Sequence, residues 1–490
     1  MTFGVDIVLI NPGDRRQIYQ ALGSDLAAVE PPFWVAVLAA YLRQQGFRVA
    51  VIDANAENLT PEETALRVAK LKPRLSCVVV YGSQPSASTQ NMTIAGAICR
   101  ALSEQRSGRV AMAGLHPSAL PERTLREESV DFVIEGEGPD ALRSLLTELM
   151  AAQSDLSRVP GLWYRDSAGI RSNSRAPLIS DLDHYLPIAA WDLLPMERYR
   201  AHNWHCFDDL EHRSPYGAVY TSLGCPYNCA FCCINAPFGK PGIRYRSPER
   251  VVDEITLLTK NCGVRNLKIV DELFVLQEEH YMAIIEGIIA RKLDLNIWAY
   301  ARVDTVKPAN LARMKQAGIN WLALGIESAN PDVRDGADKR MQVFDITAVV
   351  RSIQDAGIRI IGNFIFGLPE DTRETMEETL QLAMDLNCEF TNFYCAMAYP
   401  GSKLYDMALA EGWELPSTWQ GFSQHSYATL PLPTSSLAAV EVLRFRDNAF
   451  HRYFANPAYL DMVEQKFGTK AREHLVEMSS TRLKRKLLGD

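Results

Sequence analysis

Strand-like and helix-like segments alternate in two separate series along this chain of 490 residues. The first series occupies residues 1–150 and the second residues 213–410. Such alternation predicts βαβ units, and therefore an α/β fold with two parallel sheets covered by helices. The chain is too long for one hydrophobic core, so we expect separate domains. Residues 151–212 are expected to form a linker with a hairpin, and residues 411–490 a small helical cap with helices at 435–453, 459–466 and 470–488.

The loops that follow the strands are the expected ligand sites. In the first series these loops are residues 11–13, 82–86, 114–118 and 135–138. Ligands of open parallel sheets bind outside the carboxyl ends of the strands. The first strand is not followed by G-x-G-x-x-G, which argues against a dinucleotide site. The six strands of the second series predict a partial (βα)6 barrel, again with its chemistry at the carboxyl ends.

Three cysteines, Cys225, Cys229 and Cys232, follow the first strand of the second series with the spacing C-x3-C-x2-C. Thiolates at short spacing suit zinc or an iron–sulfur cluster. A closed structural zinc site needs four ligands, whereas three thiolates on four irons leave one iron open. The spacing favours a reactive cluster. A zinc knuckle with a distant fourth ligand, or simply buried thiols, are the alternatives.

The cysteine motif, with Phe231 before its third cysteine, resembles the cluster motif of the radical S-adenosylmethionine (SAM) superfamily. The resemblance implies a [4Fe–4S] cluster whose open iron is chelated by SAM. It also implies an external one-electron donor, flavodoxin- or ferredoxin-like, because one electron cleaves SAM to methionine and a 5′-deoxyadenosyl radical.

Polar residues at the strand ends of the second series complete this resemblance. SAM is a zwitterion joined to a nucleoside, so its ammonium needs a carboxylate, its carboxylate a cation and its ribose an acceptor. Asp271 and Glu272 stand where the family contacts the amino group, and Arg302 could pair the carboxylate. The resemblance assigns to SAM the residues Phe231, Asp271, Glu272, Arg302, Glu327, Ser328 and Gly367.

The first series resembles the cobalamin-binding, Rossmann-like domain at the front of many radical SAM enzymes. The resemblance rests on Pro-Pro-Phe-Trp at 31–34, Ala-Gly-Leu-His-Pro-Ser at 113–118 and Glu-Gly-Glu-Gly at 135–138. It assigns to cobalamin the residues Pro12, Ser83, Gln84, Ser86, Gly114, His116, Glu135 and Gly136. The motif D-x-H-x-x-G is absent, which implies no histidine ligand below the cobalt. The alternative is a flavodoxin-like domain with an empty pocket.

Aromatic and polar side chains outside the two series are the candidates for a substrate pocket. These are Trp204 in the linker, and Trp419, His425 and Tyr427 in a loop that precedes the helices of the cap. Ordinary packing is the alternative for all four residues.

Composition narrows the partners and the location. The formal net charge is −8 and no basic face is evident, which argues against a nucleic-acid partner. No apolar run approaches the ~18 residues of a membrane span, so membrane binding is not expected. Apart from the motif, the ten cysteines are scattered, which fits a reducing cytoplasm.

The architecture resembles that of cobalamin-dependent radical SAM methyltransferases. It implies methylation of an unactivated carbon, or of a phosphinate phosphorus, in a small-molecule substrate through a 5′-deoxyadenosyl radical and methylcobalamin. One alternative is ring closure, ring contraction or cyclisation on the same scaffold, and another is a non-catalytic corrinoid-binding protein. A methylthio-transferring tRNA enzyme is disfavoured, because the first series holds only the isolated Cys77 and Cys99.

Overall fold

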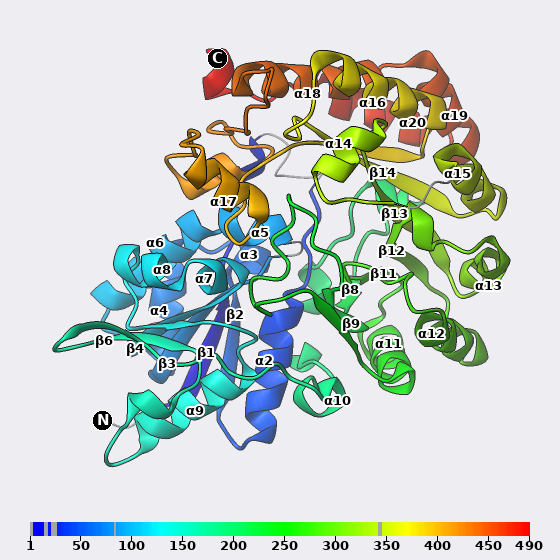
Figure 1. The fold of residues 1–490 in the computed structure, drawn as a ribbon. Helices are drawn as coiled ribbons and strands as arrows, with labels where there is room; N and C mark the ends of the chain where they lie inside the picture. The colour runs from blue at the N-terminus through cyan, green and yellow to red at the C-terminus, as the bar shows by residue number, and fades with distance from the viewer. Residues whose placement is uncertain (1–2, 14–17, 21–26, 83–84, 342–344) are drawn as a thin grey trace.

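The computed structural model describes residues 3–13, 18–20, 27–82, 85–341 and 345–490 (Figure 1). Two parallel sheets organise these residues, as the alternating series predict. Within them, no helix is both long and apolar enough to cross a lipid bilayer.

A seven-stranded sheet forms the N-terminal part, in the order β2-β1-β3-β4-β5-β6-β7. Its first five strands are parallel, and the hairpin β6–β7 adds two antiparallel strands at one edge. This order is that of a flavodoxin-like doubly wound sheet, whose switch point lies between β1 and β3. The strands are β1 (Val5–Asn11), β2 (Val49–Asp53), β3 (Pro73–Val80), β4 (Arg109–Gly114), β5 (Phe132–Ile134), β6 (Leu162–Asp166) and β7 (Gly169–Ser172).

Helices cover both faces of this sheet because its central strands are apolar on both sides. Along β1, Ile7 and Leu9 contribute to one hydrophobic cluster, and Val8 and Ile10 to the other. Successive side chains of a strand point to opposite faces, so a run buried on both faces requires two helical layers. One layer contains α2 (Phe33–Gln44) and α9 (Pro139–Met150), and the other contains α4 (Pro61–Leu71) and α6 (Met92–Glu104). Short helices fill the loops: α3 (Ala54–Glu57), α5 (Pro85–Gln90), α7 (Leu115–Ala119), α8 (Pro121–Glu127) and, in the linker, α10 (Leu182–Tyr185).

The second sheet has six parallel strands in the order β15-β14-β13-β12-β11-β8, as expected of a partial barrel. The strands are β8 (Tyr216–Val219), β11 (Asn266–Ile269), β12 (Asn296–Arg302), β13 (Ile319–Glu327), β14 (Arg359–Phe366) and β15 (Phe390–Cys395). The outer helices are α11 (Pro248–Cys262), α12 (Glu278–Ala290), α13 (Leu311–Gln316), α15 (Ile346–Asp355) and α16 (Arg373–Leu386), with α14 (Pro331–Gly336) and α17 (Lys403–Ala410) in loops. A separate hairpin of β9 (Ser222–Cys225) and β10 (Gly242–Tyr245) carries the cysteine loop.

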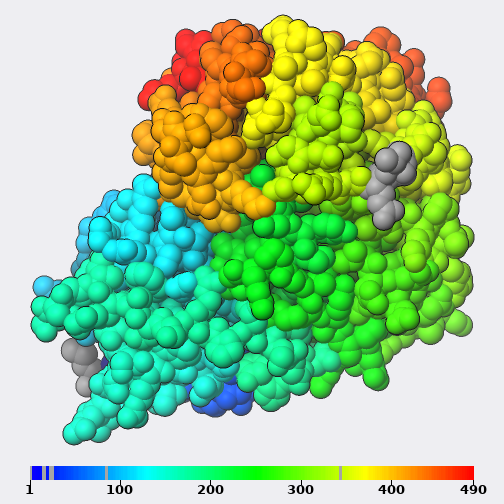
Figure 2. Space-filling view, in the orientation of Figure 1, coloured from blue at the N-terminus to red at the C-terminus, as the bar shows by residue number. Residues whose placement is uncertain are grey.

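Helices α18 (Ala439–Phe454), α19 (Pro457–Phe467) and α20 (Thr469–Ser480) pack beside the last strand of the barrel. The Tyr453 hydroxyl donates to the Cys388 carbonyl at 2.9 Å, and the Tyr459 hydroxyl to the Glu389 carbonyl at 3.1 Å. Figure 2 shows the preceding segment, in orange, against both the cyan N-terminal part and the yellow-green part of the barrel. Its short helix η8 (Trp419–Phe422) packs on α5 and α6, so the C-terminal part contacts both sheets.

The helix expected at 470–488 is wrong in its second half. It ends at Ser480, and residues 481–485 are non-helical before the single turn η9 (Lys486–Leu488). Tertiary contacts override local helix propensity here. Arg485 is 0% exposed because its side chain bonds to other segments of the C-terminal part, which a continuous helix could not provide.

Candidate active site

A cavity of about 820 Å³ lies between the interior of the barrel and the carboxyl edge of the first sheet. Alternate residues of β12 and β14 face it, as the two-residue period of a strand requires, whereas β15 lies along its edge and lines it with the consecutive residues 390–394. The barrel contributes Ala218, Lys268, Trp298, Tyr300, Ala323, Ile361, Asn363, Asn392 and Tyr394, and the first sheet and α2 contribute Asn11, Pro12, Trp34, Tyr81 and Gly82. Trp34 and Tyr81 stack with ring centroids 4.4 Å apart, so that side of the cavity is a rigid aromatic wall.

The cysteine loop starts at the end of β9 and is fixed by its backbone. The Ala230 N–H donates to the Ala337 carbonyl, and the Ala230 carbonyl accepts from the Leu404 N–H, both at 2.9 Å. The three residues of the motif are half-buried, whereas the neighbouring Cys233 is 1% exposed. The structure therefore separates the three predicted ligands from the fourth cysteine of the loop.

The chemistry of these three thiols fits an iron–sulfur cluster. Burial raises the pKa of the Cys225 thiol to about 11, and burial also raises the pKa of Cys229 and Cys232. Such thiols become thiolates when a metal stabilises the negative charge. No three Cys, His, Asp or Glu side chains of the described residues are placed to share a single metal ion. A [4Fe–4S] cluster does not need that arrangement, because each thiolate binds a different iron.

Asp271, predicted to contact the amino group of SAM, holds the turn before the cysteine loop. Its carboxylate accepts hydrogen bonds from the Thr221 N–H and hydroxyl at 2.6 Å, and from the Ser222 hydroxyl at 2.5 Å. Burial raises the pKa of Asp271 to about 6, and the three donors partly oppose that shift. These contacts give Asp271 a positioning role, and its contact with SAM stays a prediction.

Glu272 is the neighbouring carboxylate that remains available. It makes no hydrogen bond with the residues described and lines a small hollow with Leu223 and Gly224 of β9. Burial raises the pKa of Glu272 to about 8. A bound cation at this place would therefore be attracted to the ionised carboxylate and would stabilise it.

Arg302, predicted to pair the SAM carboxylate, is already paired in the structure. Its guanidinium forms two bonds of 2.9 Å with Asp304 and donates to the Arg340 carbonyl at 2.7 Å. The guanidinium also lies over the ring of Tyr227, 4.0 Å from the centroid. Because Tyr227 belongs to the cysteine loop, Arg302 fastens that loop to the end of β12.

Glu327 pairs with a cation, Lys339, that no sequence motif indicates. The Lys339 Nζ lies 2.7 Å from Glu327 Oε1, and both side chains are 8% exposed. Glu327 has φ of 65° where the pairing of β13 with β14 shifts register. Gly325 leaves room for the pair, since a Cβ there would lie 2.6 Å from Glu327 Oε1 and 2.8 Å from Lys339 Nζ. Lys339 follows no motif, so no signal in the sequence could have found it.

Three further residues predicted for SAM have packing contacts. The Ser328 hydroxyl lies 3.1 Å from the Thr379 hydroxyl, with Ser328 0% exposed. Gly367 has φ of 80°, and a Cβ there would lie 2.4 Å from Cγ1 of Val442 on α18. Phe231 is half-buried in a hydrophobic cluster beside the cysteine loop. Ser328 and Gly367 thus support the end of the barrel through their packing contacts with α16 and α18.

Of the residues predicted for cobalamin, Pro12 lines the cavity. Ser83 and Gln84 lie outside the described residues, and Ser86 is half-buried in α5. Gly114 has φ of 135° and approaches the Val80 carbonyl so closely that a Cβ would lie 2.3 Å from it. The Gly136 N–H donates to the Ser118 hydroxyl at 3.0 Å.

His116 and Glu135 have protein partners away from the cavity. His116 is 1% exposed, with Nδ1 3.1 Å from the Thr89 hydroxyl and its ring edge-on to Trp419. Glu135 accepts from the Trp163 indole and from Arg175, each at 2.7 Å. Open space meets an aromatic wall at the carboxyl ends of β1 and β3, whereas His116 and Glu135 are not among the residues that line the cavity, so their contact with cobalamin stays a prediction.

Two of the four substrate candidates line the cavity, namely Trp204 and His425. Trp204 packs among Trp298, Trp321 and the ring of His202, at the base of the barrel. Trp419 lies under the guanidinium of Arg123 instead, and the Tyr427 hydroxyl donates to the Asp490 carbonyl at the surface. Trp419 and Tyr427 are therefore not cavity residues.

Comparisons with known proteins agree with this geometry. The radical SAM superfamily matches residues 219–383, and the B12 binding domain matches residues 19–146. An uncharacterized methyltransferase of Pyrococcus horikoshii is 31% identical over 418 residues, which cover 85% of this chain and 86% of the relative. An anaerobic magnesium-protoporphyrin IX monomethyl ester cyclase of Rubrivivax gelatinosus is 26% identical over 450 residues, covering 90% of this chain and 77% of the relative.

Solved structures share the whole fold. The radical SAM methyltransferase TsrM of Kitasatospora setae, with cobalamin and a [4Fe–4S] cluster bound, has a TM-score of 0.68 at 18% identity, covering 92% of this chain and 89% of that one. The cobalamin-dependent radical SAM enzyme OxsB has a TM-score of 0.68 at 15% identity, covering 97% of this chain and 72% of that one. The chain therefore belongs to the radical SAM superfamily and is a cobalamin-dependent, methyltransferase-like enzyme whose cofactors are a [4Fe–4S] cluster, SAM and cobalamin.

Proposed function

We propose that this enzyme methylates an unactivated carbon, or a phosphinate phosphorus, of a small-molecule substrate. The observation that carries the proposal is the single cavity shared by the barrel interior and the carboxyl edge of the first sheet. A substrate held there faces both domains at once, as methyl transfer from a corrinoid to a substrate radical requires. Relatives named as a methyltransferase and as a cyclase share this scaffold, so the scaffold is compatible with either kind of reaction.

The residues of the site divide into ligands and positioning groups. Cys225, Cys229 and Cys232 would hold the cluster, and Glu272 would receive the SAM ammonium. The Lys339 ammonium, beside Cys229, offers the SAM carboxylate a cation, while Glu327 balances its charge. When bound, the cluster with SAM supplies a hydrogen-abstracting radical, and the corrinoid supplies a methyl group that an unactivated carbon cannot take from SAM directly.

The division of labour follows the predicted limits of the domains. Residues 1–150 would hold the corrinoid, 213–410 the cluster and SAM, and 411–490 would close the substrate cavity, with 151–212 as the link. An external flavodoxin- or ferredoxin-like protein would supply the electron. The aromatic groups that surround the cavity would exclude water from a radical intermediate.

Isotope transfer tests this function. The protein is reconstituted without oxygen with iron, sulfide and hydroxocobalamin, reduced, and incubated with SAM carrying a deuterated methyl group and a metabolite extract of the producing cells. Methyl transfer predicts a deuterium-labelled product together with both 5′-deoxyadenosine and S-adenosylhomocysteine. 5′-Deoxyadenosine with an unlabelled, cyclised product would instead establish the cyclase alternative. Absence of SAM cleavage in a cluster-loaded protein would leave only a corrinoid carrier.

A further inference from the structure

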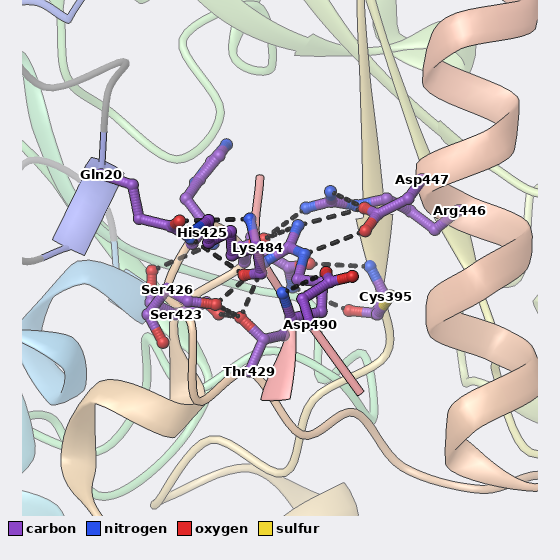
Figure 3. A network of polar contacts seen from close by, with 12 residues as sticks. Gln20, Cys395, Ser423, His425, Ser426, Thr429, Arg446, Asp447, Lys484 and Asp490 are labelled. Atoms are coloured by element: carbon purple, nitrogen blue, oxygen red, sulfur yellow. Dashed lines mark hydrogen bonds and ion pairs between the residues drawn. The ribbon is translucent and has the colours of Figure 1, made fainter. Parts of the chain in front are cut away.

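The C-terminal segment, residues 481–490, runs along one side of the cavity. Six of its residues line the cavity: Thr481, Arg482, Leu483, Lys484, Leu488 and Asp490. Figure 3 shows Lys484 and Asp490 of this segment beside Asp447 of α18 and the loop residues His425, Ser426 and Thr429. Three parts of the chain that are distant in sequence therefore meet at this side of the cavity.

Arg485 anchors the segment at a fixed place. Its guanidinium bonds to Asp447 at 2.9 and 3.0 Å and donates to the Ser426 carbonyl at 3.0 Å and the Gln424 carbonyl at 3.1 Å. The Lys484 backbone exchanges two hydrogen bonds of 3.2 Å with the side-chain amide of Gln20, which belongs to the N-terminal part (Figure 3). A buried cation with this many partners holds the segment in one conformation.

The anchoring places two cations at the cavity. Arg482 and Lys484 are exposed and line it, and Arg444 of α18 lines it as well. None of the three forms an ion pair within the described part of the chain. The other lining cations are paired: Lys268 with Glu30 at 3.0 Å, and Arg446 with Asp447 at 2.6 Å. Each of these two cations thus has an acidic partner, whereas the first three have none among the described residues.

The described side chains that line this cavity carry a net positive charge, whereas the net charge of the chain is negative. Among the described lining residues there are five lysines and arginines against three aspartates and glutamates, although the whole chain has a net charge of −8. A cleft of one sign concentrates ligands of the opposite sign. An uncharged substrate would give no reason for three unpaired cations at one side of the cavity.

We propose that the substrate carries an anionic group, a carboxylate or a phosphate, which Arg482 and Lys484 of the C-terminal segment bind together with Arg444 at the cavity entrance. Calling the ligand a substrate rests on the function proposed above. Lys268, 2% exposed and 4.8 Å from the Trp298 ring, lies deeper in the cavity and remains with Glu30.

Matched probes test the entrance in the full chain, loaded with cluster and hydroxocobalamin so that the corrinoid phosphate is already in place. Calorimetry compares 2-naphthoate, 2-naphthyl phosphate and the neutral 2-naphthamide, which share one aromatic body. At low ionic strength the tighter of the two anions should bind about fivefold more strongly than the amide, because two or three exposed cations of the protein attract its charge. The preference should shrink as salt shortens the screening length. The better anion identifies the class of anionic group.

Two variants locate the preference. Arg482→Gln with Lys484→Gln should remove most of it, because only Arg444 remains, whereas Lys486→Gln should keep it, since Lys486 lies in the same segment and does not line the cavity. Equal binding of the amide and both anions, failure of both anions to bind at millimolar concentration, or a preference that the double variant leaves undiminished would each overturn the proposal. The probes need no turnover. An enzyme with the preference but no methyl transfer would refute only the proposed function, and a methyltransferase without the preference would refute only the anionic entrance.

Discussion

Replacing Asp271 distinguishes a residue that positions the cysteine loop from one that binds SAM. The structure gives its carboxylate three donors, the Thr221 N–H and the hydroxyls of Thr221 and Ser222. Burial raises its pKa from 3.8 to about 6, so at pH 7 ionisation within the fold costs roughly 3 kcal/mol. Because the folded-state pKa is raised, this penalty is absent below the unfolded pKa and is complete above about 6.

The two substitutions at Asp271 have different expected effects. Asp271→Ala leaves three donors without their acceptor, which costs about 1–3 kcal/mol for each donor. The substitution also removes the buried charge, which restores roughly 3 kcal/mol. The net loss of stability around the turn should therefore be about 3 kcal/mol. Asp271→Asn keeps an acceptor for the Thr221 N–H and removes the charge, so its loss should stay within about 1 kcal/mol.

Hydrogen exchange of the Thr221 amide measures the local loss, which for Asp271→Ala corresponds to about a hundredfold faster exchange. The alanine variant should also retain less iron after reconstitution. The asparagine variant should keep its iron and bind SAM within about threefold of the unaltered protein, because its amide preserves the turn. If the asparagine variant kept its iron but lost SAM affinity more than tenfold, Asp271 would be a SAM ligand and the assignment to positioning would be wrong.

Three further substitutions probe the loop, the anchor and the barrel end. Cys225→Ala should lose most of the bound iron in a colorimetric assay while Cys233→Ala keeps it; equal losses would refute the assignment of ligands. Arg485→Met should cost about 3 kcal/mol by breaking a buried ion pair and should speed hydrogen exchange of residues 481–490. Unchanged exchange there would show that Arg485 is no anchor. Gly367→Ala should lower the thermal midpoint, since its Cβ would lie 2.4 Å from Val442 at a positive φ, and Val442→Ala should restore part of the loss. No recovery in the double variant would leave backbone strain as the whole cause.

The sequence predicts the fold where the information is local. Apolar runs separated by helical segments locate the strands, and the spacing of Cys225, Cys229 and Cys232 locates the loop at the end of a strand. The order of the first sheet, with β1 between β2 and β3, could not be predicted, because the periodicity of a strand does not identify its neighbours. The hairpin of β9 and β10 was missed for the same reason.

The site is harder to predict because its contacts join distant segments. Asp271 and Ser328 stand at strand ends as expected. Each forms a hydrogen bond with a threonine about 50 residues away along the chain, Asp271 with Thr221 and Ser328 with Thr379. Lys339 reaches Glu327 only because the chain returns beside the irregular end of β13. Residues 481–485 favour a helix locally, but the buried contacts of the Arg485 side chain stabilise the chain more than one additional helical turn would.

The most direct test of the account is the ultraviolet–visible spectrum of the protein after anaerobic reconstitution with iron, sulfide and hydroxocobalamin, followed by desalting. We expect a retained corrinoid band together with the broad absorption of a thiolate-bound iron–sulfur cluster, with the cluster absorption lost in Cys225→Ala. Cluster absorption with the corrinoid removed by desalting would contradict methyl transfer through cobalamin, because that reaction requires both groups at one cavity.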